Sequence, residues 1–270
     1  MQTIQRIVYK FREFKTNLGT AIIQVMNLTE LNETPFLPPD CSACKQKTLC
    51  LPEGLSNEEF VNCSNIVTFN KKIRKGSRLF HAGDPLRFLY IVKLGSVKSS
   101  IVTDEGREQV IGFNMSGEML GIDGIYHGFH TCTATALEDS EVCVMPYEDL
   151  EALCGQSPAI DSHVRRLFSR EIVLQHHNLL MLGSMSSTER LAAFLLSLSK
   201  RFEARGFSRT EFVLRMTRAD IGSFLGLKLE TISRALSKFT ELGLIEIHQK
   251  HVHIVNPKGL RSILQEHKRI

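Results

Sequence analysis

The stretch Thr217–Gly243, T-R-A-D-I-G-S-F-L-G-L-K-L-E-T-I-S-R-A-L-S-K-F-T-E-L-G, decides the fold of the C-terminal part of this 270-residue chain. Thr217 and Asp220 form a capping signal that predicts the start of a first helix. Gly226 predicts the tight turn that ends it. A second helix is expected from about Leu229 to Leu242. Helix, short glycine turn and helix together form the outline of a helix-turn-helix.

The second helix of this stretch has two chemically different faces. Glu230, Ser233 and Arg234 share the polar face, at spacings of three and four residues. Arginine suits a guanine edge, glutamate suits the amine of cytosine, and serine suits either. We therefore expect these three side chains to read DNA bases. The opposite face is expected to turn to the core through Ile232, Ala235, Leu236 and Phe239.

The surroundings of this stretch also favour double-stranded DNA as the partner. Two β-rich runs, 244–248 and 251–255, flank Gln249-Lys250 and predict a hairpin that could serve as a wing on the phosphates. From residue 188 to the end we count 15 Lys+Arg and 8 Asp+Glu, a net charge of +7. The whole chain carries 33 − 29 = +4, so residues 1–187 carry 18 − 21 = −3. A basic third on a slightly acidic body indicates a polyanion partner.

A second informative stretch is Cys41–Cys50, C-S-A-C-K-Q-K-T-L-C, which places Cys41, Cys44 and Cys50 within ten residues. A disulfide uses two thiols and leaves one over, whereas a metal ion or an iron–sulfur cluster takes thiolates in threes and fours. We expect Lys45 and Lys47 to lower the thiol pKa values and favour the ligating thiolate. Spacing alone does not choose between zinc and iron–sulfur, and an unligated reducing loop stays open.

Composition predicts a two-domain, cytoplasmic protein without membrane spans. The chain is 43% hydrophobic, enough for real cores, and no apolar run approaches the length of a membrane span. Its 7 cysteines are odd in number and no signal peptide precedes them, so a disulfide framework is not expected. The segment 56–66 opens with a Ser-x-x-Glu capping box and predicts a short helix with Cys63 packed in it.

The middle of the chain changes rhythm twice. Short β-rich runs alternate with glycine turns over 67–148, which indicates an antiparallel β-roll and makes the fold class α+β. From about Pro158 to Met185 the period becomes helical. Apolar residues then follow steps of 4, 4, 3, 4 and 3, a coiled-coil-like seam that favours a homodimer over packing against the chain's own β-roll. The seam consists of Val164, Phe168, Ile172, Gln175, Leu179 and Leu182.

Several motifs together carry a family resemblance over roughly residues 41–256. E-R-L-A-A-F at 189–194, R-G-F-S at 205–208 and T-R-A-D-I-G-S-F-L-G-L with E-T-I-S-R at 217–234 resemble the FNR branch of the cyclic-AMP receptor/FNR regulators, as does the cysteine loop. The resemblance implies an oxygen-sensing transcription regulator and no enzyme. Such proteins bind a [4Fe–4S] cluster without oxygen, dimerise, and bind an inverted repeat like TTGAT-N4-ATCAA. Oxygen converts the cluster, and DNA binding falls away.

The resemblance also assigns individual residues. Cys143, in A-L-E-D-S-E-V-C-V-M-P-Y, matches the position of the fourth cluster ligand, so Cys132 and Cys154 are interpreted as structural or incidental. On residue types alone Cys132 is hard to exclude. Glu230, Ser233 and Arg234 match the base-reading positions. The segment 102–107 resembles a surface loop used on RNA polymerase, although Arg107 is basic where an acidic residue is common.

Position 175 departs from the resemblance, which suggests an acidic residue there in several relatives. Gln175 is neutral, so two copies facing each other across a dimer would not repel. We therefore expect the cluster-free protein to dimerise more readily than an acidic counterpart. The expected domains are a flexible arm at 1–40, a cluster loop and β-roll at 41–157, a dimerisation helix at 158–187 and a winged helix-turn-helix at 188–270.

Three alternatives remain in view at this point. A cyclic-nucleotide-responsive regulator of the same fold needs an Arg-Ser pair for the cyclic phosphate. Here Gly121 is followed by Ile122 and the segment 130–133 reads His-Thr-Cys-Thr, which leaves the anion without a guanidinium. A zinc-structured regulator fits the cysteine spacing as well as a cluster does. An electron-transfer or redox enzyme is disfavoured because ferredoxin loops repeat their ligands more closely.

Overall fold

The computed structural model describes residues 41–45, 47–51 and 54–264, and the arm expected at 1–40 lies outside these residues. The described part begins with two short helices, α2 (Lys47–Cys50) and α3 (Asn57–Asn65). Ser56 Oγ accepts a hydrogen bond from the Glu59 backbone N–H, and the Glu59 carboxylate accepts one from the Ser56 N–H. The capping box predicted at this position is therefore present. Cys63 is buried in α3, as predicted.

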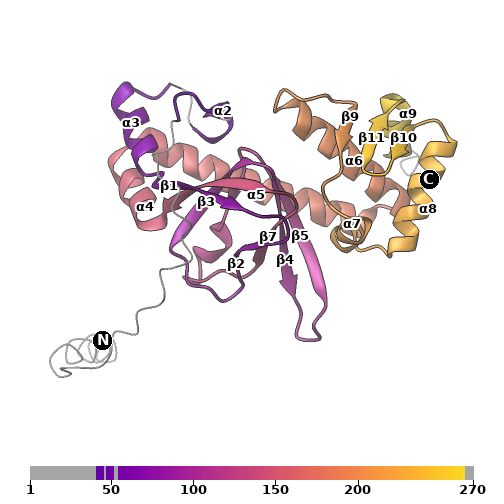
Figure 1. Cartoon of the computed structure of the whole chain (residues 1–270), viewed down its shortest axis with the longest axis horizontal. Helices are drawn as coiled ribbons and strands as arrows, with labels where there is room; N and C mark the ends of the chain where they lie inside the picture. The colour runs from indigo at the N-terminus through magenta and orange to yellow at the C-terminus, as the bar shows by residue number, and fades with distance from the viewer. Residues whose placement is uncertain (1–40, 46, 52–53, 265–270) are drawn as a thin grey trace. The chain divides into compact units, whose positions relative to one another are not determined.

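The β-roll consists of two four-stranded antiparallel sheets, ordered β1-β8-β3-β6 and β2-β7-β4-β5 (Figure 1). Alternating side chains of both sheets bury the core between them; Val92, Val97 and Val142 have no exposed surface. The strands are β1 (Phe69–Ile73), β2 (Arg78–Phe80), β3 (Phe88–Leu94), β4 (Ser96–Val102), β5 (Glu108–Met115), β6 (Met119–Leu120), β7 (Thr133–Ala136) and β8 (Ser140–Pro146).

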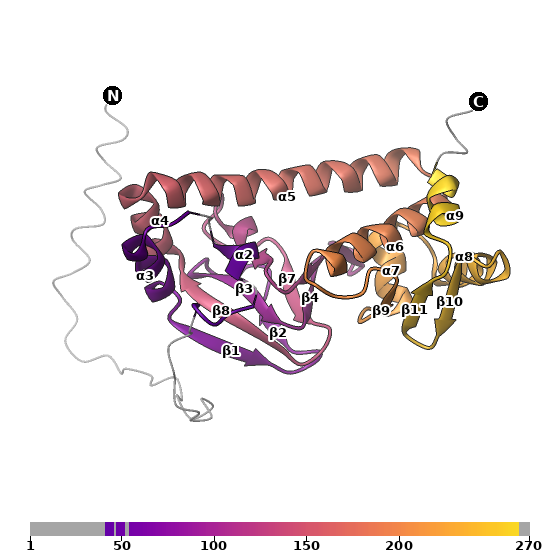
Figure 2. The same ribbon diagram turned by 90° about the horizontal axis from the view of Figure 1, so that it is seen from above.

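Two helices follow the β-roll, α4 (Tyr147–Gln156) and the long α5 (Pro158–Ser184). Figure 2 shows α5 as one unbroken helix. Ser157 Oγ caps its N-terminus by accepting from the Ile160 N–H, and Pro158 occupies the first turn, where its missing N–H costs nothing. Ile160 and Val164 are buried, whereas Leu179 is 67% exposed. The two halves of α5 therefore have different environments.

The C-terminal part is a winged helix-turn-helix, as predicted. Thr217 caps α7 in a complete capping box, Gly226 ends it in the left-handed conformation, and β10 and β11 form the predicted hairpin. A third strand, β9, pairs with β11 and was not predicted. The elements are α6 (Ser187–Glu203), β9 (Glu211–Val213), α7 (Arg218–Leu225), α8 (Leu229–Glu241), β10 (Ile245–His248), β11 (His251–Ile254) and α9 (Pro257–Ser262). The α+β class expected from the sequence is confirmed.

Partly buried arginines connect these elements. Arg190 of α6 donates to the carbonyls of Leu182, Met185 and Leu225, at 2.7, 2.9 and 3.0 Å. One guanidinium therefore satisfies backbone oxygens at the ends of both α5 and α7, where helical carbonyls lack intrahelical partners. Glu118, in the turn before β6, pairs with Arg205 Nη2 at 2.6 Å and also with Arg201. These ion pairs join the β-roll to α6.

Candidate metal centre and nucleic-acid interface

The thiols expected to bind a metal or cluster line one cavity of about 60 Å³, which we call the thiol cavity. Cys41, Cys44 and Cys50 reach it from the loop around α2, and Cys143 reaches it from β8. Its other walls are mainly apolar and come from β3, β8, α3 and α5. Residues almost a hundred positions apart in the sequence are thus brought to one water-poor space.

Burial dominates the electrostatics of these thiols. Burial, followed by the interaction with Cys44 and Cys41, raises the pKa of Cys50 to about 12, and Cys143 adds to the rise. Burial likewise raises the pKa of Cys143 to about 12, with Cys41 adding and Lys93 opposing. The four thiols line the same cavity. The raised values mean that bound metal must displace protons from them.

The expectation that Lys45 and Lys47 lower the thiol pKa values is wrong for Cys50 and Cys143, whose pKa values rise. Lys45 is exposed, and the Lys47 ammonium lies 3.4 Å from the Ser42 carbonyl oxygen. The cation that does favour the Cys143 thiolate is Lys93 of β3. Which lysine stabilises the thiolate therefore depends on its position in the fold and not on its proximity in the sequence.

Three further residues of the thiol cavity escaped the sequence-based prediction as parts of a site. His163 of α5 lies with Nε2 3.3 Å from the Cys50 carbonyl oxygen, and burial lowers the pKa of this imidazole. Lys93 lines the wall and pairs with Glu141 at 2.8 Å. Cys63 supplies a fifth thiol, and burial raises its pKa to about 11. No local sequence signal distinguishes His163 or Lys93, since both reach the cavity only through the fold.

The two cysteines interpreted as structural lie elsewhere. Cys132 belongs to the core between the two sheets, and burial together with the nearby Asp123 raises its pKa to about 12. Cys154 of α4 is half-buried outside the lining of the thiol cavity. No disulfide joins any two of the described cysteines.

The donor set is suited in its chemistry to a metal ion or to a cluster. Among residues 41–45, 47–51 and 54–264, no three His, Cys, Asp or Glu side chains form a group that could hold a metal ion. A tetrahedral zinc site needs its sulfurs about 2.3 Å from one ion, which draws them tightly together. An iron–sulfur cluster spreads its thiolates over separate iron atoms. Four cysteines line the thiol cavity, and four is the number of thiolates that either kind of site takes.

The Asp123 carboxylate occupies the part of the β-roll where a cyclic-nucleotide-responsive regulator would need hydrogen-bond donors for the cyclic phosphate. Asp123 Oδ2 accepts from the backbone N–H of Thr131 and of Cys132, at 2.7 and 3.1 Å. His130 is buried beside the same carboxylate and stacks on Phe80 with ring centroids 3.8 Å apart. These donors are already bonded to an internal anion. A cyclic phosphate would meet a like charge there, which argues against that alternative.

The residues expected to read DNA lie on one side of α8. Glu230 and Arg234 are exposed, and Ser233 is partly exposed. Ser233 Oγ accepts from Nη1 of Arg218 at 3.2 Å, so the first residue of α7 reaches the same face. Arg218 was not predicted, although a basic residue at a helix N-terminus next to a capping threonine could have drawn attention. Four polar side chains therefore stand together on this surface.

The expected seam of α5 divides between two environments. Val164 and Phe168 pack against the chain's own core around α3 and β3. Ile172 and Leu179 are 56% and 67% exposed. Gln175 is exposed, and its amide nitrogen donates to Glu171 Oε1 at 2.7 Å. Leu182 is partly buried where α5 meets α6.

The segment expected to resemble a polymerase-contacting loop is the turn between β4 and β5. Arg107 there pairs with Glu105 at 2.7 Å, and both side chains are exposed. None of the helices in the described part of the chain is long and apolar enough to cross a membrane.

Two families match separate parts of the chain. Residues 70–157 match the family described as cyclic nucleotide-binding domain, and residues 189–263 match the Crp-like helix-turn-helix domain. Among solved structures, FixK2 from Bradyrhizobium japonicum is 28% identical with a TM-score of 0.67, covering 72% of this chain and 96% of its own. The Xanthomonas campestris regulator CLP, described as responsive to c-di-GMP, is 24% identical with a TM-score of 0.60. The second likeness bears on the fold alone.

Curated relatives are similar over most of the chain. The transcriptional regulatory protein btr of Bordetella pertussis is 42% identical over 84% of this chain and 96% of its own length. Electron transport regulator A of Shewanella oneidensis is 43% identical over 83% of this chain and 89% of its own. The fumarate and nitrate reduction regulatory protein of Escherichia coli is 42% identical over the same shares.

Proposed function

Because the chain belongs to the Crp/FNR family of transcription regulators, which are DNA-binding proteins and not enzymes, we propose that it senses oxygen through a [4Fe–4S] cluster. The observation that carries the proposal is the convergence of Cys41, Cys44, Cys50 and Cys143 on the thiol cavity. When bound, the cluster supplies an oxidisable iron–sulfur centre. The names of relatives that regulate fumarate and nitrate reduction or electron transport agree with a role in anaerobic metabolism.

The protein's own residues would hold such a cluster and connect it to the rest of the chain. Cys41, Cys44, Cys50 and Cys143 would ligate it as thiolates. Lys93 on the cavity wall offsets part of their negative charge, an interaction strengthened by the apolar surroundings. His163 donates to the Cys50 carbonyl and so ties the ligand loop to α5. Apolar walls from β3, β8 and α5 keep bulk water from the iron–sulfur bonds.

DNA binding in this proposal depends on a homodimer formed through the exposed half of α5. Ile172, Gln175 and Leu179 lie on one face and are exposed, so the apolar side chains of Ile172 and Leu179 are left uncovered in the single chain. Two copies of α8 then meet successive major grooves, as the two-fold symmetry of an inverted repeat like TTGAT-N4-ATCAA requires. Glu230, Ser233 and Arg234 read base edges, and Arg218 holds Ser233 and an adjacent phosphate. RNA polymerase is the further partner, and the protein acts in the cytoplasm as activator or repressor.

The test is a joint measurement of iron, sulfide, zinc and DNA affinity on protein purified without oxygen. We expect four iron and four sulfide per chain, brown colour, and tight binding to the inverted repeat that is lost in air. Cys143→Ala should lose both iron and DNA binding. Cys132→Ala is the matched control, since this buried thiol lies in the other core, and it should keep both.

The measurement also decides between the alternatives. Colourless protein with one zinc per chain would replace the proposal with a zinc-structured regulator. Iron retained by Cys143→Ala but lost by Cys132→Ala would refute the ligand assignment. Tightening of DNA binding by cyclic AMP would favour the cyclic-nucleotide alternative, which the Asp123 carboxylate argues against.

A further inference from the structure

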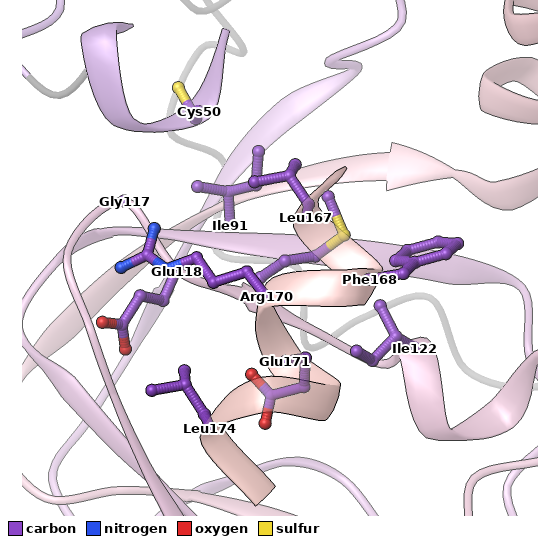
Figure 3. Close-up of a pocket in the computed structure, with 11 residues that line it drawn as sticks. Cys50, Ile91, Gly117, Glu118, Ile122, Leu167, Phe168, Arg170, Glu171 and Leu174 are labelled. Carbon is purple, nitrogen blue, oxygen red and sulfur yellow. The ribbon is translucent and has the colours of Figure 1, made fainter. Parts of the chain in front are cut away.

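A second cavity, of about 40 Å³, adjoins the thiol cavity, and we call it the side cavity. The two cavities share Cys50, Ile91, Met119 and Leu167 as lining residues. Figure 3 shows Cys50 at one end, Glu171 and Leu174 at the other, and Ile91 and Leu167 between them. The side cavity therefore leads along α5 to a proposed cluster ligand.

The lining of the side cavity is mainly apolar. Ile122, Leu167, Phe168 and Leu174 supply aliphatic and aromatic surface, and charged groups come from Glu118, Arg170 and Glu171. One water-sized molecule needs about 10–15 Å³ of such volume. A volume of about 40 Å³ thus accommodates a diatomic molecule but no bulky oxidant.

The outer end of the side cavity is accessible from solvent. Leu174 is 38% exposed, Arg170 is exposed and Glu171 is partly exposed. Residues 167, 171 and 174 cluster on one side of α5, and Ile172, Gln175 and Leu179 cluster roughly 110° further round, from the 100° per residue of an α-helix. A dimer through the second face leaves the first beside the interface and not under it.

From this continuity we propose that the side cavity is the entry site for dioxygen, with Leu167 and Ile91 forming the wall between it and the cluster. The inference rests on the proposed function, because dioxygen needs a cluster to reach. Ile91 is 8% exposed and fixed in β3, so Leu167 is the movable part of the wall. Leucine rotamers change within nanoseconds where packing allows, which is fast enough to admit a diatomic gas.

The test compares the rate of cluster bleaching after mixing anaerobic protein with air-saturated buffer. Leu174→Trp narrows the outer end without touching the thiol cavity, so it should bleach at least about threefold more slowly, a change in barrier of about 0.65 kcal/mol. Leu167→Ala removes the wall and should bleach faster. Leu180→Trp is the matched control, since Leu180 is 59% exposed on the same helix and lines neither cavity.

Two further readouts separate gas entry from other effects. Ferricyanide is too bulky for the side cavity, so its rate of cluster oxidation should be the same in wild type, Leu174→Trp and Leu180→Trp. Parallel changes with oxygen and ferricyanide would show that the substitutions act on the cluster itself and would overturn the inference. Crystals of the full chain under xenon pressure should show xenon against Phe168, and its absence would also overturn it.

Failure of the proposed function is distinguishable from failure of this inference. Iron and sulfide analysis of the wild-type protein comes first, and absence of a cluster overturns both. A normal cluster whose bleaching rate is unchanged in Leu174→Trp and Leu167→Ala overturns the entry site alone.

Discussion

Replacing Asp123 by asparagine should destabilise the β-roll by an amount that depends on pH. Burial opposes ionisation of this carboxyl, but hydrogen bonds from His130, Thr131 and Cys132 outweigh it and hold the pKa of Asp123 at about 2, below the usual 3.8. Each pKa unit corresponds to about 1.36 kcal/mol, which gives roughly 2 kcal/mol after allowance for the partly exposed side chain. Asparagine keeps one oxygen acceptor, so the loss reports mainly the charge.

The sign of the pH dependence follows from the depressed pKa of Asp123. The stabilisation is fully present above the unfolded value of 3.8 and disappears as pH falls through the folded value of about 2. In urea denaturation followed by circular dichroism, the free energy of unfolding of the wild type should exceed that of Asp123→Asn by roughly 2 kcal/mol at pH 7 and by about half of that at pH 3. Asp104→Asn, an exposed carboxylate in the turn between β4 and β5, should change stability by less than about 0.5 kcal/mol. A gap for Asp123→Asn that is absent at pH 7, or that grows on acidification, would refute the reasoning.

Three other substitutions probe the DNA face, the dimer helix and the buried ion pairs. Arg234→Ala should cost about 1–3 kcal/mol on the inverted repeat in fluorescence anisotropy and far less on random DNA, because a bidentate guanine contact is lost; equal losses would make it a phosphate contact. Gln175→Asp should weaken the cluster-free dimer in sedimentation, since two carboxylates would then face each other across the seam and repel, whereas Gln175→Asn should not. Glu118→Gln should lower the free energy of unfolding by about 3 kcal/mol, because the buried Arg205 loses its counter-charge; an unchanged midpoint in urea would contradict this.

Local signals in the sequence predicted the elements well. Some signals depend only on contacts within a few residues, so they can be predicted without tertiary structure. They are the capping boxes at Ser56 and Thr217 and the glycine at position 226. The three-residue strand β9 has no comparable signal. Its pairing with β11 depends on residues some forty positions away.

The candidate site was harder to predict from the sequence than the helices and strands, because it depends on which strands and helices pack together. The cysteine spacing marks Cys41 and its neighbours, but nothing in the sequence indicates that Lys93 and His163 complete the cavity wall. The helical period of α5 identifies an apolar face without saying what covers it. Val164 is covered by the chain's own core, whereas Leu179 is left exposed. The helical period predicts which residues of α5 share a face, but only the packing of the fold shows what that face contacts.

The hydrogen bonds of Arg190 couple the C-terminal end of α5 to the helix-turn-helix, so a tilt of α5 would move both together. His163 touches the ligand loop near one end, and the Leu182 carbonyl is held by Arg190 near the other. These two points lie about 28 Å apart at 1.5 Å per residue. A tilt of about 5° pivoting near His163 would move the far end by roughly 2.5 Å over that length. Because the same guanidinium also donates to the Leu225 carbonyl of α7, α7 would move together with the end of α5. The position of the recognition helix α8 would therefore depend on the angle that α5 makes with the ligand loop.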